Sequence, residues 1–273
     1  MLYLLFSIIT SALIGNLLYI FKRDPQIKIL QIFLGNYFLA AIFSASMNDT
    51  PLNNIGSFEI LWGMLTGFLF LVNFLCYQKN IRVNGLSLSV GTMRTSLIIP
   101  IFFALVIFKE QIYLANYLGI AVIIVAFAII TETKKFSSLL WLALLFLLTG
   151  LGESSIKFYE VYGLAQKGSY LFFLFGSAFL FNLIWIAWEK QQIHWKSLGY
   201  GLILGIPNML TSKYLLYALE KIPATIVFPL AASSVVVLTI LADYFIWKKE
   251  FSRKRKISFA LIIIGIVLIN MHM

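Results

Sequence analysis

The sequence is poor in the residue types on which most soluble enzymes and secreted domains depend. It has one cysteine in 273 residues, Cys76, which excludes an intrachain disulfide and a cysteine-rich metal cluster. Its two histidines, His194 and His272, lie in a predicted loop and at the terminus, so the sequence offers no metal site and no Ser-His-Asp set. Charged residues make up only 12% of the chain, whereas a typical soluble domain has about 25%. These shortages argue against a soluble globule, and we expect no metal and no other cofactor.

What the chain has in excess is apolar surface, with 61% hydrophobic residues. A helix needs about 20 mostly apolar residues to cross a bilayer, and ten segments meet this requirement. The first segment lacks the positive region of a signal peptide, so we interpret it as a retained span. The predicted fold class is therefore an all-α integral membrane protein with ten transmembrane helices. The predicted spans cover approximately residues 1–21, 27–46, 58–77, 85–107, 112–131, 138–158, 169–188, 197–218, 223–247 and 257–272.

Basic residues are concentrated on one side of the predicted membrane. Of the 21 Lys and Arg residues, fifteen fall in the loops after the first, third, fifth, seventh and ninth spans. Because cytoplasmic loops are rich in Lys and Arg, this bias predicts that these loops are cytoplasmic and that both termini lie outside. The net charge of +10 is then mainly a topology signal. We therefore predict no nucleic-acid partner, and a multi-pass protein of the cell inner (plasma) membrane.

The two halves of the sequence share a pattern. With a shift of 140 positions, residues 76–110 overlay residues 216–250, and each stretch ends on a Lys-Glu pair. This pattern predicts two five-helix repeats, over residues 1–132 and 133–273. Because five is odd, the second repeat enters the membrane upside down relative to the first. Inverted repeats around a central site are a recurring design of secondary transporters, which work by alternating access.

The layout resembles that of EamA-type members of the drug/metabolite transporter superfamily. The resemblance covers nearly the whole chain. It rests on the five-plus-five pattern, on TGFLFLVNFLCYQKN and TSKYLLYALEKIPAT before the fourth and ninth spans, and on the Lys-Glu pairs that close those spans. It implies a ten-helix transporter that exports or imports amino acids, other small metabolites or drugs. The Gly-Ala-Leu-Asn-Lys-like motif of the nucleotide-sugar branch is missing from the ninth span, which argues against that substrate class.

Ionisable residues inside the spans are the first candidates for function. Burying such a group in hydrocarbon costs at least about 2.5 kcal/mol, so by default it marks a pathway or a pair. Arg94 lies near the middle of the fourth span, among hydroxyl side chains. Its guanidinium would clamp a carboxylate or a phosphate through two parallel hydrogen bonds, unless backbone carbonyls satisfy it as a structural residue. Pro100, farther along the same span, predicts a break in the helix.

A second charged group lies on the sixth predicted span. Glu153 and Lys157 are four residues apart, so both project from one face of a helix. On the charge-based topology, Lys213 of the eighth span lies at a similar depth. One interpretation is a structural ion cluster. The other is a coupling or gating site in which Glu153 takes up a proton, which makes the proton the coupling ion that we consider.

Further polar and aromatic side chains in the spans are candidates for lining a substrate cavity. Interhelical hydrogen bonding and anchoring at the membrane interface are their alternative roles. Pro207, Pro223 and Pro229, together with Gly201 and Gly205, predict bending of the eighth and ninth spans. Besides Arg94, the substrate-site candidates are Asn16, Tyr19, Asn36, Trp62, Asn73, Thr92, Asn208, Thr211, Lys213, Tyr214 and Ser233.

These features predict a secondary active transporter that moves a small carboxylate-bearing metabolite, with an amino acid favoured, by alternating access. The positive charges of Arg94, Lys157 and Lys213 outnumber the negative charge of Glu153, which favours an anionic group. Proton-coupled efflux of cationic drugs through Glu153 is the alternative, and a channel or an integral membrane enzyme is less favoured. The expected partners are the substrate and membrane lipid, and the expected assembly is a monomer or a homodimer.

Overall fold

The computed structural model describes residues 1–47, 54–131, 137–164, 166–248, 250 and 252–271, and the elements α1 to α11 of this part of the chain are all helices. Apolar segments adopt helices in a membrane because each main-chain N–H then finds its acceptor within the same segment. The helices are α1 (Leu2–Phe21), α2 (Ile29–Ser46), α3 (Ser57–Asn84), α4 (Leu86–Thr95), α5 (Ile98–Val106), α6 (Leu114–Ile130), α7 (Leu139–Tyr162), α8 (Lys167–Trp188), α9 (Trp195–Leu219), α10 (Ala224–Phe245) and α11 (Arg253–Asn270).

Most of the predicted spans are long, apolar helices. Among the described residues, 8 helical segments are long and apolar enough to cross a membrane, with α4 and α5 taken together as one of them. The apolar helix α6 has 17 residues, and the 18 residues of α11 begin with the basic run Arg253, Lys254, Arg255 and Lys256. The all-helical, multi-pass membrane fold is thereby confirmed. The full count of ten spans and the inverted repeat stay predictions.

The fourth predicted span is broken, as Pro100 predicts. Helix α4 ends at Thr95 and α5 begins at Ile98. Pro100 has no N–H to offer the carbonyl of Ser96, four residues earlier, and its ring crowds that carbonyl. The Ser96 carbonyl accepts instead from the main-chain N–H of Ile99, at 2.9 Å. The break leaves a helix end inside the predicted span.

The helices group into two compact units, and each unit takes residues from both halves of the sequence. Unit 1 comprises Met1–Leu71 and Ser155–Ala218, and unit 2 comprises Val72–Ser154 and Leu219–Met273. Unit 1 therefore holds α1, α2, α8 and nearly all of α9, with the first part of α3 and the last part of α7. Unit 2 holds α4, α5, α6, α10 and α11, with the remaining parts of α3 and α7.

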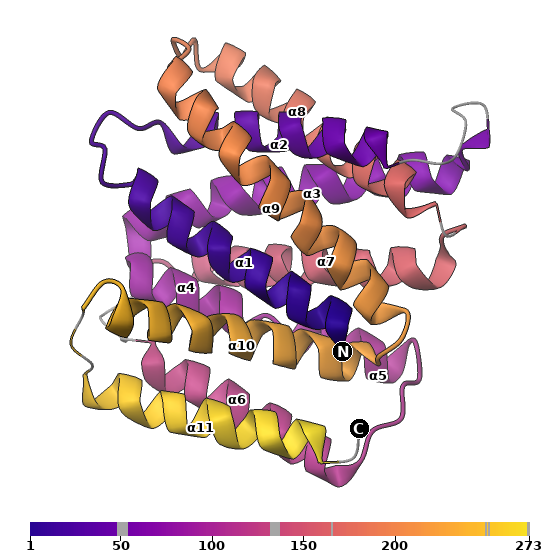
Figure 1. Ribbon diagram of the computed structural model, residues 1–273, viewed down its shortest axis with the longest axis vertical. Helices are drawn as coiled ribbons and strands as arrows, with labels where there is room; N and C mark the ends of the chain where they lie inside the picture. The colour runs from indigo at the N-terminus through magenta and orange to yellow at the C-terminus, as the bar shows by residue number, and fades with distance from the viewer. Residues whose placement is uncertain (48–53, 132–136, 165, 249, 251, 272–273) are drawn as a thin grey trace. The chain divides into compact units, whose positions relative to one another are not determined.

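In unit 1, α2 runs along α8 (Figure 1). The buried ring of Tyr37 on α2 lies opposite Phe175 on α8, with the ring centroids 6.5 Å apart. Helix α9 lies directly against α2, because Gly201 and Gly205 leave room for main-chain contact around Asn36. We predicted that these two glycines allow bending. That bending stays a prediction, and the structure shows that both glycines serve close packing, the role that a Gly-x-x-x-Gly spacing favours in membrane helices.

The prolines of the eighth and ninth predicted spans leave their helices continuous. Pro207 lies inside α9 and Pro229 lies inside α10. Pro223 is the residue before α10, where its fixed φ angle and missing N–H are tolerated. The break at Pro100 has no counterpart in α9 or α10, and bending of these two helices stays a prediction.

In unit 2, α6 and α11 lie side by side (Figure 1). Gly119 on α6 and Gly265 on α11 each face the main chain of the other helix. The buried amide of Asn116 donates to the carbonyl of Ile269 at 2.7 Å, and its oxygen accepts from the N–H of Tyr113 at 2.8 Å. One side chain thus caps the start of α6 and also ties that helix to α11. Helix α10 packs against both α5 and α11.

Candidate substrate site

Arg94 lies in the last turn of α4, within unit 2, and its side chain is half-buried. Its positive charge interacts with the carboxylate of Glu153 on α7 and with the hydroxyl of Tyr77 on α3. The carbonyl end of a helix carries a partial negative charge, so the end of α4 also favours a cation at this position. In the part of the chain that the structure describes, the guanidinium makes no hydrogen bond and no ion pair at contact distance.

Glu153 is also half-buried, and its charge interacts with that of Arg94. Within the described ranges, its carboxylate accepts no hydrogen bond and touches no basic side chain. The guanidinium of Arg94 and the carboxylate of Glu153 thus attract each other without an ion pair at contact distance.

The residues around this pair are already bonded within unit 2. Asn73, a predicted site residue, accepts a hydrogen bond from the hydroxyl of Thr149 at 2.9 Å. Thr92, another predicted site residue, donates to the carbonyl of Leu88 at 2.8 Å, one turn earlier in α4. The charges of Arg94 and Glu153 therefore interact without touching, and Asn73 and Thr92 have protein partners.

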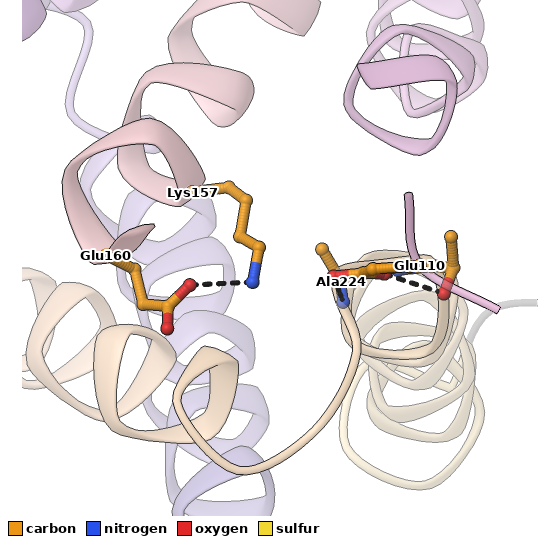
Figure 2. Close-up of polar contacts among 5 residues, drawn as sticks. Glu110, Lys157, Glu160 and Ala224 are labelled. Carbon is orange, nitrogen blue, oxygen red and sulfur yellow. Dashed lines mark hydrogen bonds and ion pairs between the residues drawn. The ribbon is translucent and has the colours of Figure 1, made fainter. Parts of the chain in front are cut away.

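Lys157 pairs with a carboxylate that our sequence reasoning did not consider. Its Nζ atom lies 2.6 Å from Oε2 of Glu160, three residues later on α7 (Figure 2). The lysine is 7% exposed, so this is a buried ion pair in unit 1. Removing one member of such a pair leaves an uncompensated buried charge, which is strongly destabilising. The charge of Lys157 is thus already balanced, and the predicted excess of positive charge is smaller by one.

Lys213 on α9 has aromatic and sulfur neighbours. Its Nζ atom lies 3.2 Å from the sulfur of Met47 and 6.0 Å from the centre of the Tyr217 ring. A second lysine, Lys167, lies 5.0 Å from the same ring. An ammonium group near an aromatic face is attracted by the ring quadrupole. Lys213 therefore belongs to a group of cations around Tyr217 in unit 1.

The other predicted site residues occupy three kinds of environment. Some bond back to their own helix, some contact a neighbouring helix, and the rest differ in how exposed they are. Their roles toward a substrate stay predictions. Within their own helices, Asn16 donates to the carbonyl of Ala12, and Ser233 donates to that of Pro229. Toward other helices, Trp62 donates to the carbonyl of Ser155, Thr211 donates to the hydroxyl of Thr10, and the ring of Tyr214 stacks near that of Tyr3. Tyr19 is exposed beside Arg23, Asn36 is buried, and Asn208 is half-buried.

Glu110 makes a structural contact that the sequence pattern did not reveal. Its carboxylate accepts from the N–H of Ala224 at 2.9 Å, and from the N–H and hydroxyl of Thr225 at 3.0 and 2.9 Å (Figure 2). In the sequence, the Lys109-Glu110 pair marks the repeat and the family resemblance, but not this contact. A carboxylate just after a span is a typical partner for the first N–H groups of another helix. Only the folded chain shows that this helix is α10.

An all-helical chain with many membrane-length apolar helices, and with charges kept inside them, is a multi-pass membrane protein. The model of the EamA-like transporter family matches residues 168–271 of the chain. The match supports, over these residues, the predicted resemblance to EamA-type members of the drug/metabolite transporter superfamily.

One solved structure, described as "Crystal structure of protein", is similar to the whole chain. Its TM-score is 0.78 at 10% sequence identity, and the likeness covers 98% of this chain and 98% of the other. At that identity the likeness concerns the fold alone. A comparison with curated proteins gives no significant match.

Proposed function

We propose that the protein is a secondary active transporter that moves a small carboxylate-bearing metabolite, with an amino acid favoured, by alternating access. The observation that carries the proposal is the guanidinium of Arg94. It is half-buried in an apolar bundle and has no hydrogen-bond partner among the described residues. An unsatisfied cation in such surroundings is costly, so a ligand that satisfies it binds favourably. The planar fork of arginine matches a carboxylate through two parallel hydrogen bonds.

Glu153 supports an amino acid over a simple carboxylate. Its charge interacts with that of Arg94, so the site offers one positive and one negative group. A zwitterion presents a carboxylate to the guanidinium and an ammonium to Glu153, and it leaves neither buried charge unpaired. A dicarboxylate would place its second negative group near Glu153, which like-charge repulsion disfavours.

The driving force that we propose is an ion gradient. The sequence has no phosphate-cradling glycine loop that would mark an ATP-driven pump. A proton carried by Glu153 is the coupling ion that the site favours. We further propose the inner (plasma) membrane as the location, with the fifteen loop Lys and Arg residues on the cytoplasmic side, and a monomer or a homodimer as the assembly.

The test is ligand binding to the purified protein with and without Arg94. We expect individual amino acids in a thermal-shift screen to raise the melting temperature of the wild type. Arg94→Ala removes two charge-assisted hydrogen bonds and should weaken binding about a hundredfold, and Arg94→Lys should weaken it less. Arg82→Ala, at an exposed position near the end of α3, is the matched control. Unchanged amino-acid binding in Arg94→Ala would contradict the proposal.

Proton-coupled efflux of cationic drugs is the second candidate, and the half-buried carboxylate of Glu153 favours it. In this case Glu153→Gln should abolish pH-dependent transport of a fluorescent organic cation in proteoliposomes, while Arg94→Ala should leave cation binding intact. For an amino acid, both substitutions weaken binding. The pair of variants therefore separates the two candidates.

A further inference from the structure

Gln31, in the first turn of α2, holds the loop between α8 and α9 with both ends of its amide. Its oxygen accepts from the main-chain N–H of His194 at 2.6 Å, and its nitrogen donates to the carbonyl of Gln192 at 2.8 Å. A third bond joins the same segments, since the N–H of Lys28 donates to the hydroxyl of Ser197 at 3.0 Å. We call this group of contacts the Gln31 clasp.

Gln166, just before α8, makes the same pair of bonds to the segment before α3. Its oxygen accepts from the N–H of Gly56 at 3.2 Å, and its nitrogen donates to the carbonyl of Asn54 at 3.0 Å. Here too a third bond follows, since the N–H of Leu164 donates to the buried carboxylate of Glu59 at 2.6 Å. We call this group the Gln166 clasp.

The segments that the two glutamines hold correspond to each other, and the glutamines themselves, Gln31 and Gln166, are 135 positions apart. In both clasps the amide oxygen takes an N–H, and the amide nitrogen reaches the carbonyl two residues earlier. One constant offset of 138 positions relates Asn54 to Gln192, Gly56 to His194 and Glu59 to Ser197.

The helix interfaces beside the clasps follow the same offset. Gly201 and Gly205 of α9 lie 138 positions after Gly63 and Gly67 of α3. Gly201 faces the carbonyl of Ile32 and the N–H of Asn36 on α2, and Gly63 faces the carbonyl of Tyr170 and the N–H of Leu174 on α8. These partners are again 138 positions apart. In each interface, glycine brings main chain against main chain, so no layer of flexible side chains separates the two helices.

We infer that α2, α8, α9 and the first part of α3 form one rigid body that stays closed at both ends throughout the protein's working cycle. The clasps lie at opposite ends of α2 (Figure 1). Gates that alternate would open one end as the other closes, whereas here both clasps are made in the same conformation. Each clasp also lies at the end of a helix interface, that of α9 with α2 or that of α3 with α8. In both interfaces main chain contacts main chain, which hinders sliding of one helix along the other. The inference goes beyond the proposed function and is independent of its substrate.

Hydrogen–deuterium exchange on the full chain in lipid nanodiscs tests this inference. In the wild type, we expect peptides over residues 190–198 and over residues 54–60 each to show one protected population. Gln31→Ala should speed exchange about tenfold in the first peptide only, because two hydrogen bonds are lost there, and Gln166→Ala should do so in the second only. Gln192→Ala and Asn54→Ala are matched controls, since these residues contribute only main-chain atoms to the clasps.

Gln31→Glu keeps the acceptor for the N–H of His194 and loses the donor to the carbonyl of Gln192. We therefore expect a smaller increase in the exchange rate over residues 190–198, and this variant can be measured even if Gln31→Ala folds poorly. Two populations with opposite protection at the two ends of the wild type would identify alternating gates and overturn the inference. Exchange unchanged in both glutamine variants, or raised at both ends by either one, would overturn it as well.

Discussion

The carboxylate of Glu110 holds Thr225 by two groups at once, accepting from its main-chain N–H at 3.0 Å and from its hydroxyl at 2.9 Å. A third bond comes from the N–H of Ala224 (Figure 2). Glu110, four residues past the end of α5, therefore satisfies the first donors of α10. The first N–H groups of a helix have no acceptor inside it, so this contact both caps α10 and fixes it to the segment that follows α5.

We predict that Glu110→Ala lowers the free energy of unfolding by about 1–3 kcal/mol, because it leaves the donors of Thr225 and Ala224 without their acceptor. Glu110→Gln keeps an acceptor oxygen and should cost less. Glu250→Ala is the matched control, since Glu250 holds the equivalent place in the shifted alignment and is exposed. The measurement is the melting temperature of each variant in detergent. Equal shifts for the Glu110 and Glu250 variants would contradict the prediction.

Replacing Gly201 or Gly199 on α9 with alanine should change the stability of the protein in opposite directions. A methyl group at Gly201 would meet the carbonyl of Ile32, whereas one at Gly199 would meet open space. Gly201→Ala should therefore destabilise unit 1 by about 1–3 kcal/mol through overpacking. Gly199→Ala should stabilise by up to about 1 kcal/mol through helix propensity. The measurement is the melting temperature of each variant compared with that of the wild type. A loss of stability in Gly199→Ala as large as that in Gly201→Ala would refute the packing role of Gly201.

Asn116 should show two separable roles. Asn116→Asp keeps the oxygen that accepts from Tyr113, but it loses the donor to the carbonyl of Ile269. Asn116→Ala loses both. We expect both variants to loosen α11, seen as faster proteolysis near its end, but only the alanine variant to lose the cap of α6 as well. Asn270→Ala serves as the control, since the side chain of Asn270 bonds only within α11. Unchanged proteolysis of α11 in both variants would show that the hydrogen bond from Asn116 to Ile269 is not needed to hold α11.

Asp24, in the loop before α2, should give the protein a pH-dependent contribution to stability. The hydrogen bond from Lys196, at 2.6 Å, lowers the pKa of this carboxyl below its ordinary value of 3.8. A lowered folded-state pKa means that the contribution is complete above the ordinary value and is lost as the pH falls through the lower one. Asp24→Asn should thus lower the melting temperature at pH 7, and the difference should vanish in strong acid.

A double-mutant cycle is the control for Asp24. At pH 7, combining Asp24→Asn with Lys196→Met should cost less than the sum of the two single changes, because both remove the same ion pair. Additive losses, or a deficit in Asp24→Asn that persists in strong acid, would show that the pair does not carry the effect.

The sequence was sufficient for the helices, because their apolar runs are long and unambiguous. It also located the break before Pro100, since a missing N–H acts on one defined carbonyl. Bending at Gly201 and Gly205 stays a prediction, and their close approach to α2 could not be predicted, because it depends on which helix lies alongside. The Gly-x-x-x-Gly spacing was the signal for close packing.

The charged residues show where sequence reasoning ends. Lys157 has Glu153 four residues before it and Glu160 three residues after it, and both spacings lie on one helix face. Spacing alone favours neither partner. In the folded chain Lys157 takes Glu160, while Glu153 interacts with Arg94 of a different helix. That second pairing depends on how α4 packs near α7, which no local pattern encodes.

The composition of the two units has a consequence for how the chain is made. Unit 1 needs Ser155–Ala218 to complete Met1–Leu71, and unit 2 needs Leu219–Met273 to complete Val72–Ser154. During synthesis, α2 therefore leaves the ribosome long before α8 exists to cover it. The early helices must wait, in lipid or beside the insertion machinery, with their glycine and amide surfaces unpaired. A fragment ending after α6 is then an unfinished half of both units, and co-expressed fragments have to find each other before either unit is complete.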